Sequence, residues 1–218
     1  RMGDARTMVR RTLICTAIIT NLLSSADAHD LFAEYIQHRV KLSVSARHVD
    51  VIVELTFFED WSARERQRMD EDGDGRIRRV EMGNYVSNLA ASLNTRVGVL
   101  MGGRRVALAL LYAPEVDLLG CDTVGRGHHR LTLHFFAPTP GGLAVGTEFI
   151  VENRLWPEAR AVGVFQAVGV GNCLLEADRP KGPVFSPTRA NEVWKFRARY
   201  LEAPAAGGDN APPSSKSG

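Results

Sequence analysis

The amino-acid sequence predicts a mainly β fold, an antiparallel β-sandwich into which a helix–loop–helix is inserted. In most of the chain, apolar and polar residues alternate with the period of two that is typical of half-buried strands. About eight such segments follow one another at the spacing of an antiparallel sandwich. Between residues 62 and 93 the apolar spacing changes to that of a helix. We therefore expect one β-sandwich domain over residues 29–202, interrupted at about residues 62–93.

The expected strands begin with two hairpins. Residues 34–57 alternate on both sides of a turn at Ser45–His48, which predicts the first hairpin. Residues 97–111 predict the second, with its turn at Gly102-Gly103, because two-residue hairpin turns favour glycine. The remaining strands are expected at residues 131–135, 149–154, 161–168 and 193–200. The last residues, 203–218, are rich in Ala, Gly, Pro and Ser and are expected to form a disordered tail.

The helical insertion begins at a capping signal. Ser62 and Glu65 have the spacing of a capping box, in which each side chain accepts a hydrogen bond from the other residue's backbone N–H. This pattern predicts a helix that ends at about Met69. A second helix is predicted by apolar residues whose spacing places them on one helix face: Met82, Tyr85, Val86, Leu89 and Leu93.

The twelve residues between the two expected helices, Asp70–Glu81, read DEDGDGRIRRVE. They match the pattern D-x-D-x-D-G-x-I-x-x-x-E of an EF-hand calcium loop. Calcium is a hard cation that takes about six to eight oxygen ligands at about 2.3–2.6 Å, more than a single carboxylate supplies. A loop that turns several oxygens inward around one ion meets this demand. The sequence therefore predicts a calcium site in this loop.

Each ligand position of the loop has a chemical role in this prediction. Positions 1, 3 and 5 bring three short carboxylates to the ion, and Gly75 at position 6 allows the sharp turn that follows. Position 7 contributes its backbone carbonyl, and position 12 supplies a glutamate long enough to bind through both oxygens. The expected calcium ligands are Asp70, Asp72, Asp74, Arg76 and Glu81.

Three features distinguish this loop from a regulatory EF-hand. Arg78 at position 9 cannot bind a cation, so a water molecule would take that place. The preceding helix is polar, and the sequence holds no second loop of this pattern. Ile77, which forms a β-bridge in paired EF-hands, is therefore expected to pack into the neighbouring core. We expect a structural ion that pins two helices to the sandwich, and not a sensor that opens an apolar groove. The alternative is a solvated acidic loop without an ion.

Residues 1–28 have the order of regions of an export signal. A basic stretch ends at Arg11, an apolar run follows from Leu13 to Leu23, and Ala26-Asp27-Ala28 fits the small-residue rule of a signal peptidase site. We expect cleavage after Ala28 and a periplasmic or secreted protein. In such an oxidising compartment Cys121 and Cys173 either form one disulfide or remain free thiols.

Three features occur together along the chain: Ala28-His29-Asp30 at the end of the signal, the aspartate-rich loop after an alternating hairpin, and Glu152–Glu158 after a strand. With them the chain resembles the exported N-terminal domain of bacterial EF-hand proteins that are associated with nickel/cobalt-type permeases. The resemblance implies a periplasmic calcium-binding domain whose partner is a membrane permease or another envelope protein.

A second hypothesis places a transition-metal site at the mature N-terminus. His29 would bind copper through its amine and imidazole, with His38, His48 or His134 as a further ligand. The protein would then bind copper, nickel or cobalt in the periplasm or assist their transport. This hypothesis requires that cleavage leaves His29 as the first residue.

Two other classes of function are not expected. The sequence lacks the common motifs of serine hydrolases, phosphate-binding loops and zinc peptidases, so we expect no enzyme activity. Outside residues 1–28, basic and acidic residues balance. Because a protein that binds phosphate backbones needs clustered surplus cations, the charge excludes a nucleic-acid binder.

Overall fold

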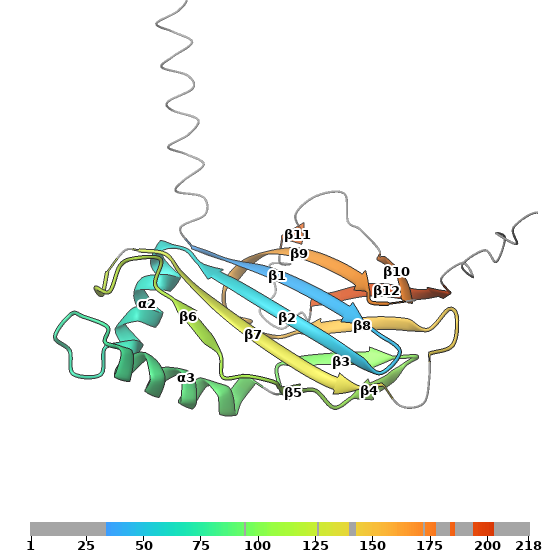
Figure 1. The fold of residues 1–218 in the computed structure, drawn as a ribbon. Coiled ribbons are helices and arrows are strands. Elements are labelled where there is room, and N and C mark those ends of the chain that lie inside the picture. Colours follow the sequence, from blue (N-terminus) through green and yellow to red (C-terminus); the bar gives the residue numbers. More distant parts are fainter. Residues whose placement is uncertain are drawn as a thin grey trace, which may run out of the picture.

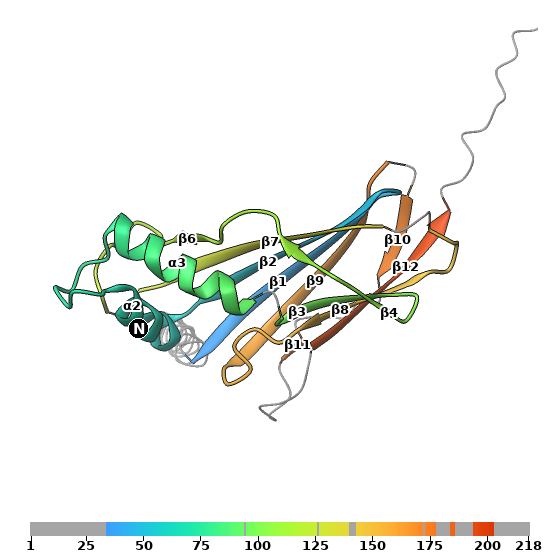
Figure 2. The ribbon, with the colours of Figure 1, turned by 90° about the horizontal axis from the view of Figure 1, so that it is seen from below.

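The computed structural model describes residues 34–93, 95–125, 127–139, 143–171, 173–177, 184–185 and 194–202. Its strands form one sheet of seven strands and one of five. The two sheets face each other as the layers of a sandwich, and two helices lie at one end (Figure 1, Figure 2). The predicted mainly β fold is therefore confirmed.

The seven-stranded sheet has the order β11-β9-β1-β2-β7-β5, with β6 also paired to β7. β1 and β2 form the predicted first hairpin, with Ile36 opposite Phe57, and β2 continues antiparallel to β7. The strands are β1 (Tyr35–Val44), β2 (His48–Phe57), β5 (Ala109–Leu110), β6 (Glu115–Asp117), β7 (His129–Pro138), β9 (Arg160–Gly169) and β11 (Val184–Phe185).

One pair of neighbouring strands departs from the antiparallel expectation. β1 and β9 run parallel, with Tyr35 opposite Arg160 and Val44 opposite Gly169. The chain reaches β9 from β8 (Glu148–Asn153), which belongs to the other sheet. Alternation of apolar residues reports which face of a strand is buried but not the direction of its neighbour, so the sequence pattern does not reveal this pair.

The five-stranded sheet has the order β10-β12-β8-β3-β4. The turn between β3 and β4 is the predicted one at Gly102-Gly103, whose φ angles of 55° and 79° suit glycine. The second hairpin is shorter than predicted, because Ala109–Leu110 joins the other sheet as β5, beside β7. The strands not yet given are β3 (Val97–Met101), β4 (Arg104–Val106), β10 (Cys173–Ala177) and β12 (Trp194–Glu202).

The hydrophobic core lies between the two sheets. Every second residue of β1, β2 and β7 is buried, and these side chains form one cluster with those from β3, β8 and β12. Each fully buried large apolar side chain contributes about 1.5–3 kcal/mol. The cluster therefore provides a stable base for the inserted helices. Its members include Leu42, Val51, Leu133, Phe149 and Phe196.

Helices α2 (Glu59–Met69) and α3 (Arg79–Leu93) form the insertion, at the end of the sheet where β2 leads into α2 (Figure 1). The apolar face predicted for α3 is confirmed, because its five predicted residues are buried or half-buried. Leu93, at the end of α3, joins the core of the sandwich.

The start of α2 differs from the prediction. The helix begins at Glu59, and Glu59 and Asp60 lie in its first turn, where acidic side chains interact favourably with the helix dipole. Ser62 and Glu65 are buried inside the helix, and the N-cap, Phe58, makes no side-chain capping bond. The predicted capping box is therefore wrong. The side chains of Ser62 and Glu65 bond to distant parts of the chain instead.

The predicted export signal, residues 1–28, and the predicted tail, residues 203–218, lie outside the described residues. Within the part of the chain that the structure describes, no helix is long and apolar enough to cross a membrane.

Candidate metal centre

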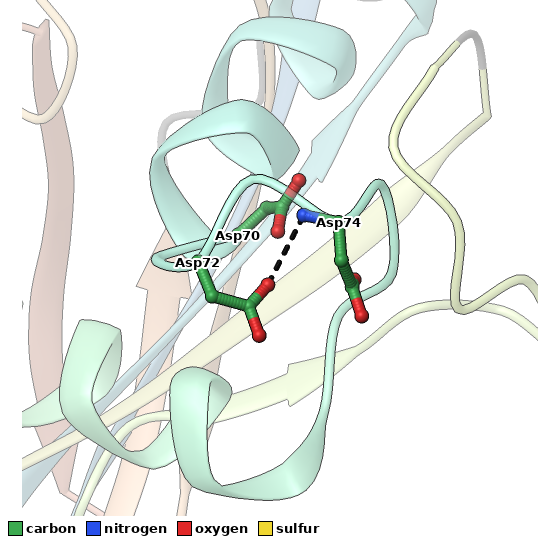
Figure 3. Close-up of side chains that lie close together, drawn as sticks. All are labelled: Asp70, Asp72 and Asp74. Carbon is green, nitrogen blue, oxygen red and sulfur yellow. Dashed lines mark hydrogen bonds between the residues drawn. The ribbon is translucent and has the colours of Figure 1, made fainter.

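The loop between α2 and α3 brings three carboxylates together. Asp70, Asp72 and Asp74 each offer a carboxylate oxygen, and these oxygens lie within 4.8 Å of one another. Figure 3 shows the three side chains on the same turn of the loop. Asp70 is half-buried, and the other two are exposed. Three of the five predicted calcium ligands thus form a compact oxygen cluster, which is a donor set suited to a hard cation.

The backbone of the loop folds around these carboxylates. Asp70 accepts hydrogen bonds from the N–H groups of Gly73 at 3.1 Å and Gly75 at 3.0 Å, and Asp72 Oδ1 accepts one from Asp74 at 3.1 Å. Gly73 and Gly75 have φ angles of 72° and 82°, a conformation that is strained for a residue with a Cβ. The glycine at position 6 is therefore required by the turn, and Gly73 is a second such position.

Glu81 closes the loop from the first turn of α3. Its side chain is buried, Oε2 accepts a hydrogen bond from the Arg78 N–H at 2.7 Å, and Oε1 accepts one from the Glu71 N–H at 3.1 Å. The bond to Arg78 is one arm of a capping box, because Arg78 directly precedes α3. The Glu81 carboxylate therefore contacts the backbone near the start of the loop, at Glu71, and near its end, at Arg78. It does not belong to the group of three aspartates.

Arg78, which the sequence pattern treats only as a missing ligand, has two acidic partners. Its guanidinium contacts Asp72 Oδ2 and Asp74 Oδ2. The hydrogen bond from Arg78 holds the pKa of Asp72 below its ordinary value. The loop therefore contains a cationic side chain directly beside the carboxylates that were predicted to bind calcium.

A segment that lies later in the sequence pairs with the loop. We call residues 118–125 the bridging segment; it follows β6 and precedes β7. Ile77 donates its N–H to the Asp122 carbonyl at 2.6 Å, and the Val124 N–H donates to the Gly75 carbonyl at 2.9 Å. Arg76 and Thr123 face each other in this antiparallel bridge. Ile77 is buried, as predicted, and its N–H also donates one hydrogen bond of this bridge, although a β-bridge was expected only between two EF-hands.

Arg66 of α2 holds the bridging segment in place. Its side chain is 0% exposed, and all five N–H directions have acceptors. Nη1 donates to the carbonyls of Cys121 at 2.7 Å and Thr123 at 2.9 Å, and Nη2 donates to those of Leu118 at 2.9 Å and His128 at 2.7 Å. Nε donates to Ser62 Oγ at 3.2 Å. Every acceptor is neutral, so the buried charge is stabilised by dipoles and not by an ion pair.

Ser62 extends this buried network to the seven-stranded sheet. Its Oγ lies 2.7 Å from Nδ1 of His129, the first residue of β7. The His129 ring stacks on Phe57, the last residue of β2, with 4.4 Å between ring centroids. Burial, helped by the charge of Arg66, lowers the pKa of His129 to about 3. His129 is therefore neutral at ordinary pH and serves as a structural link, not as a proton carrier.

Glu65 connects α2 to α3 and to the turn after β8. The carboxylate is buried, Oε2 accepts a hydrogen bond from the Tyr85 hydroxyl at 2.7 Å, and Oε1 accepts from Trp156 Nε1 at 3.2 Å and Arg68 Nη1 at 2.7 Å. Burial and the nearby Glu65 charge raise the pKa of Tyr85. We call Ser62, Glu65 and Arg66 the helix root, because they attach α2 to three separate parts of the molecule.

The three described histidines of the transition-metal hypothesis form no group of three potential metal ligands. His29 lies outside the described residues. His38 is buried beside Asn153, His48 pairs with Asp50, and His134 contacts the ring of Tyr112. Among the residues that the structure describes, the three aspartates are the group with three potential metal ligands. Of the two alternatives for the cysteines, the structure has free thiols, with Cys121 exposed and Cys173 buried.

Comparisons with known proteins identify no family for this chain. No protein-family model matches the sequence, and no curated protein matches it. Among solved structures, the M1 zinc metallopeptidase from Deinococcus radiodurans is 13% identical, with 76% of this chain and 38% of that chain covered and a TM-score of 0.26. A structure of a mutant of that peptidase gives the same identity and TM-score, with 75% and 38% covered. The chain spans less than half the length of these structures, and at this TM-score no activity is transferred from them.

Proposed function

We propose that the loop over residues 70–81 binds a calcium ion, and that the ion fastens α2 and α3 to the β-sandwich as a structural element. The observation that carries this proposal is the meeting of three aspartate oxygens within 4.8 Å on a turn with two positive-φ glycines. The order of residues in the loop and the carboxylate cluster in the structure support the same site.

The chemistry of the donors favours calcium over other common metals. The proposed ligands are the carboxylates of Asp70, Asp72, Asp74 and Glu81 and the backbone carbonyl of Arg76, and all of these donors are oxygens. Copper, nickel and zinc favour imidazole or thiolate ligands, which this loop lacks. Magnesium demands near-ideal octahedral geometry and retains its waters, whereas calcium accepts an irregular set of oxygens.

The surroundings of the loop support a structural role over a sensor role. A calcium sensor opens an apolar groove between two helices that can move apart. Here α2 is held by the helix root, with Arg66 bonded to the bridging segment and Glu65 bonded to Tyr85 and Trp156. The ion would therefore tighten an arrangement that is already assembled, without enzyme chemistry of its own.

The proposed compartment agrees with this role. We infer that the protein is exported, on the signal pattern of residues 1–28. Calcium sites of extracellular modules bind with a Kd of about 10⁻⁴–10⁻³ M, which suffices for a structural ion where calcium is plentiful. A transition-metal role for His29 receives no support from the described residues.

Isothermal titration calorimetry of the mature chain with Ca²⁺ tests the proposal. We expect one saturable site, which Asp70→Ala abolishes because position 1 loses its carboxylate. Glu71→Gln is a matched control: Glu71 is exposed, its carboxylate bonds to Asn84 at 2.8 Å, and its loss removes the same charge from the same loop. The proposal is wrong if the unmodified protein shows no saturable binding, or if both variants weaken binding equally.

A further inference from the structure

Arg78 covers the carboxylate oxygens that the loop leaves open. Asp72 Oδ1 accepts a hydrogen bond from the Asp74 N–H at 3.1 Å, and Asp74 Oδ1 accepts one from the Arg76 N–H at 2.8 Å. The remaining oxygen of each aspartate, Oδ2, contacts the guanidinium of Arg78. In each of these two carboxylates, therefore, one oxygen is hydrogen-bonded to the backbone and the other to Arg78.

We propose that Arg78 is a tethered counter-ion that a metal must displace from Asp72 and Asp74, and that this competition sets the calcium affinity of the loop. The inference rests on the proposed function of the loop. The inference adds a second effect of Arg78 at position 9. Besides supplying no oxygen ligand, this residue weakens calcium binding because its guanidinium occupies oxygens that the ion would need.

The geometry suits an exchange between the two cations. A planar guanidinium can contact two carboxylates at once, which a lysine ammonium cannot do with the same fork. The side chain of Arg78 is 52% exposed, and its guanidinium bonds, among the described residues, are those to the two aspartates. It can therefore move into water when an ion arrives. Because it is attached to the loop, its effective concentration at the site is high when no ion is present.

The same contact has an opposite effect on the loop without metal. Carboxylates that converge on one point repel one another, and a cation between them offsets this repulsion. Removing the guanidinium is therefore expected to loosen the ion-free loop and to strengthen metal binding. A residue that merely failed to supply a ligand would do neither.

The test compares Arg78→Gln with Arg79→Gln and Arg78→Lys in calcium titrations of the full chain. Arg79 is the next residue, is exposed, and takes no part in the proposed site, so its variant removes the same formal charge without uncovering the aspartates. We expect Arg78→Gln to lower the Kd for Ca²⁺ about tenfold, the size of the repulsion between a monovalent and a divalent cation at about 6 Å in water. Arg79→Gln should change Kd by less than about threefold because its charge is more screened. The change in Kd caused by Arg78→Lys should fall between the changes caused by the two glutamine variants.

A second measurement keeps the test valid if a variant is poorly folded. With a chelator present, Arg78→Gln should lose protection of the 70–78 amides in hydrogen exchange, whereas the core strands and the Arg79→Gln loop should not change. Equal calcium affinity of Arg78→Gln and the unmodified protein would overturn the inference and leave the proposed function standing. If neither the unmodified protein nor Arg78→Gln binds calcium, both the inference and the proposed function are wrong. Binding by Arg78→Gln alone would support the inference and reject calcium as the resident ion of the natural loop.

Discussion

The loop and the helix root attach the same pair of helices, and each contains an arginine, but the two arginines are used in different ways. Arg66 is fully buried and donates five hydrogen bonds to neutral oxygens. Arg78 is half-exposed and faces two carboxylates. The contacts of Arg66 are all made within the protein, whereas those of Arg78 would, under the proposed function, be exchanged for a dissolved cation. We therefore call the attachment by Arg66 permanent and the attachment by the loop adjustable.

The largest effect is expected from breaking the permanent attachment. Arg66→Met removes the donors of four carbonyls in and beside the bridging segment, and buried unpaired carbonyls are costly. We expect a loss of about 3–5 kcal/mol in the free energy of unfolding. Urea denaturation followed by circular dichroism measures it.

Arg64→Met is the matched control for that change. Arg64 is on the same helix, is exposed, and lies over the Trp61 ring at 4.9 Å. Its loss should cost less than about 1 kcal/mol. Equal losses in the two variants would show that the buried network has no special role.

Acid should weaken the helix root. The pKa of His129 is lowered from 6.5 to about 3 in the folded protein. Between these two pH values the unfolded chain binds a proton at this residue and the folded chain does not. Stability is unaffected above pH 6.5 and falls between pH 6.5 and 3, by up to about 1.4 kcal/mol per pH unit. At pH 5 this amounts to about 2 kcal/mol.

His38, whose pKa burial also lowers to about 3, adds a similar loss. Between pH 7.5 and 5 the slope of unfolding free energy against pH should therefore rise from near zero toward two protons, and His129→Gln should lower its value near pH 5 toward one. An unchanged slope in that variant would mean that His129 is protonated in the folded state.

Under the proposed function, calcium should change stability by a smaller amount, because it would act only on the adjustable attachment. With 1 mM Ca²⁺ and a Kd of about 0.1 mM, mass action gives about 1.4 kcal/mol. Thermal unfolding of the unmodified protein in calcium and in chelator should differ by this amount. Asp70→Ala should melt at one temperature in both conditions, and a calcium-dependent shift in that variant would place the ion elsewhere.

The smallest effect is expected from a side chain of the bridging segment. The loop and Arg66 bond to the backbone of this segment, and the exposed Cys121 thiol lies 3.2 Å from Thr123 Oγ1. Cys121→Ser keeps a donor and acceptor at this place and should change stability by less than about 0.5 kcal/mol. A larger loss in chemical denaturation would show that side chains, and not carbonyls, hold the segment.

The sequence predicted the parts of the fold that depend on local spacing. The alternation in residues 35–57 placed the first hairpin, and the glycine pair at 102–103 placed a turn. The apolar face of α3 and the positions of the three loop aspartates also follow from the spacing of residues that are close in the sequence. In each case the side chains that matter lie within one element or one short loop, where backbone geometry converts spacing directly into position.

The helix root could not be predicted in this way. Ser62 and Glu65 have the spacing of a capping box, but their partners His129, Tyr85 and Trp156 lie 67, 20 and 91 residues away. The same is true of Arg66, whose partners are backbone carbonyls that any residue could supply. No side-chain pattern in the sequence marks a contact of this kind.

By itself, therefore, the sequence determined the alternating strands, the two-helix insertion and the order of oxygen donors in the loop. Only the tertiary structure decided that β9 lies parallel to β1 and that a segment without EF-hand character bridges the loop. The physical reason is the range of the interactions. Periodicity and turn chemistry act between near neighbours, whereas a buried guanidinium or a β-bridge is satisfied by whichever distant backbone the packing of the two sheets brings to it.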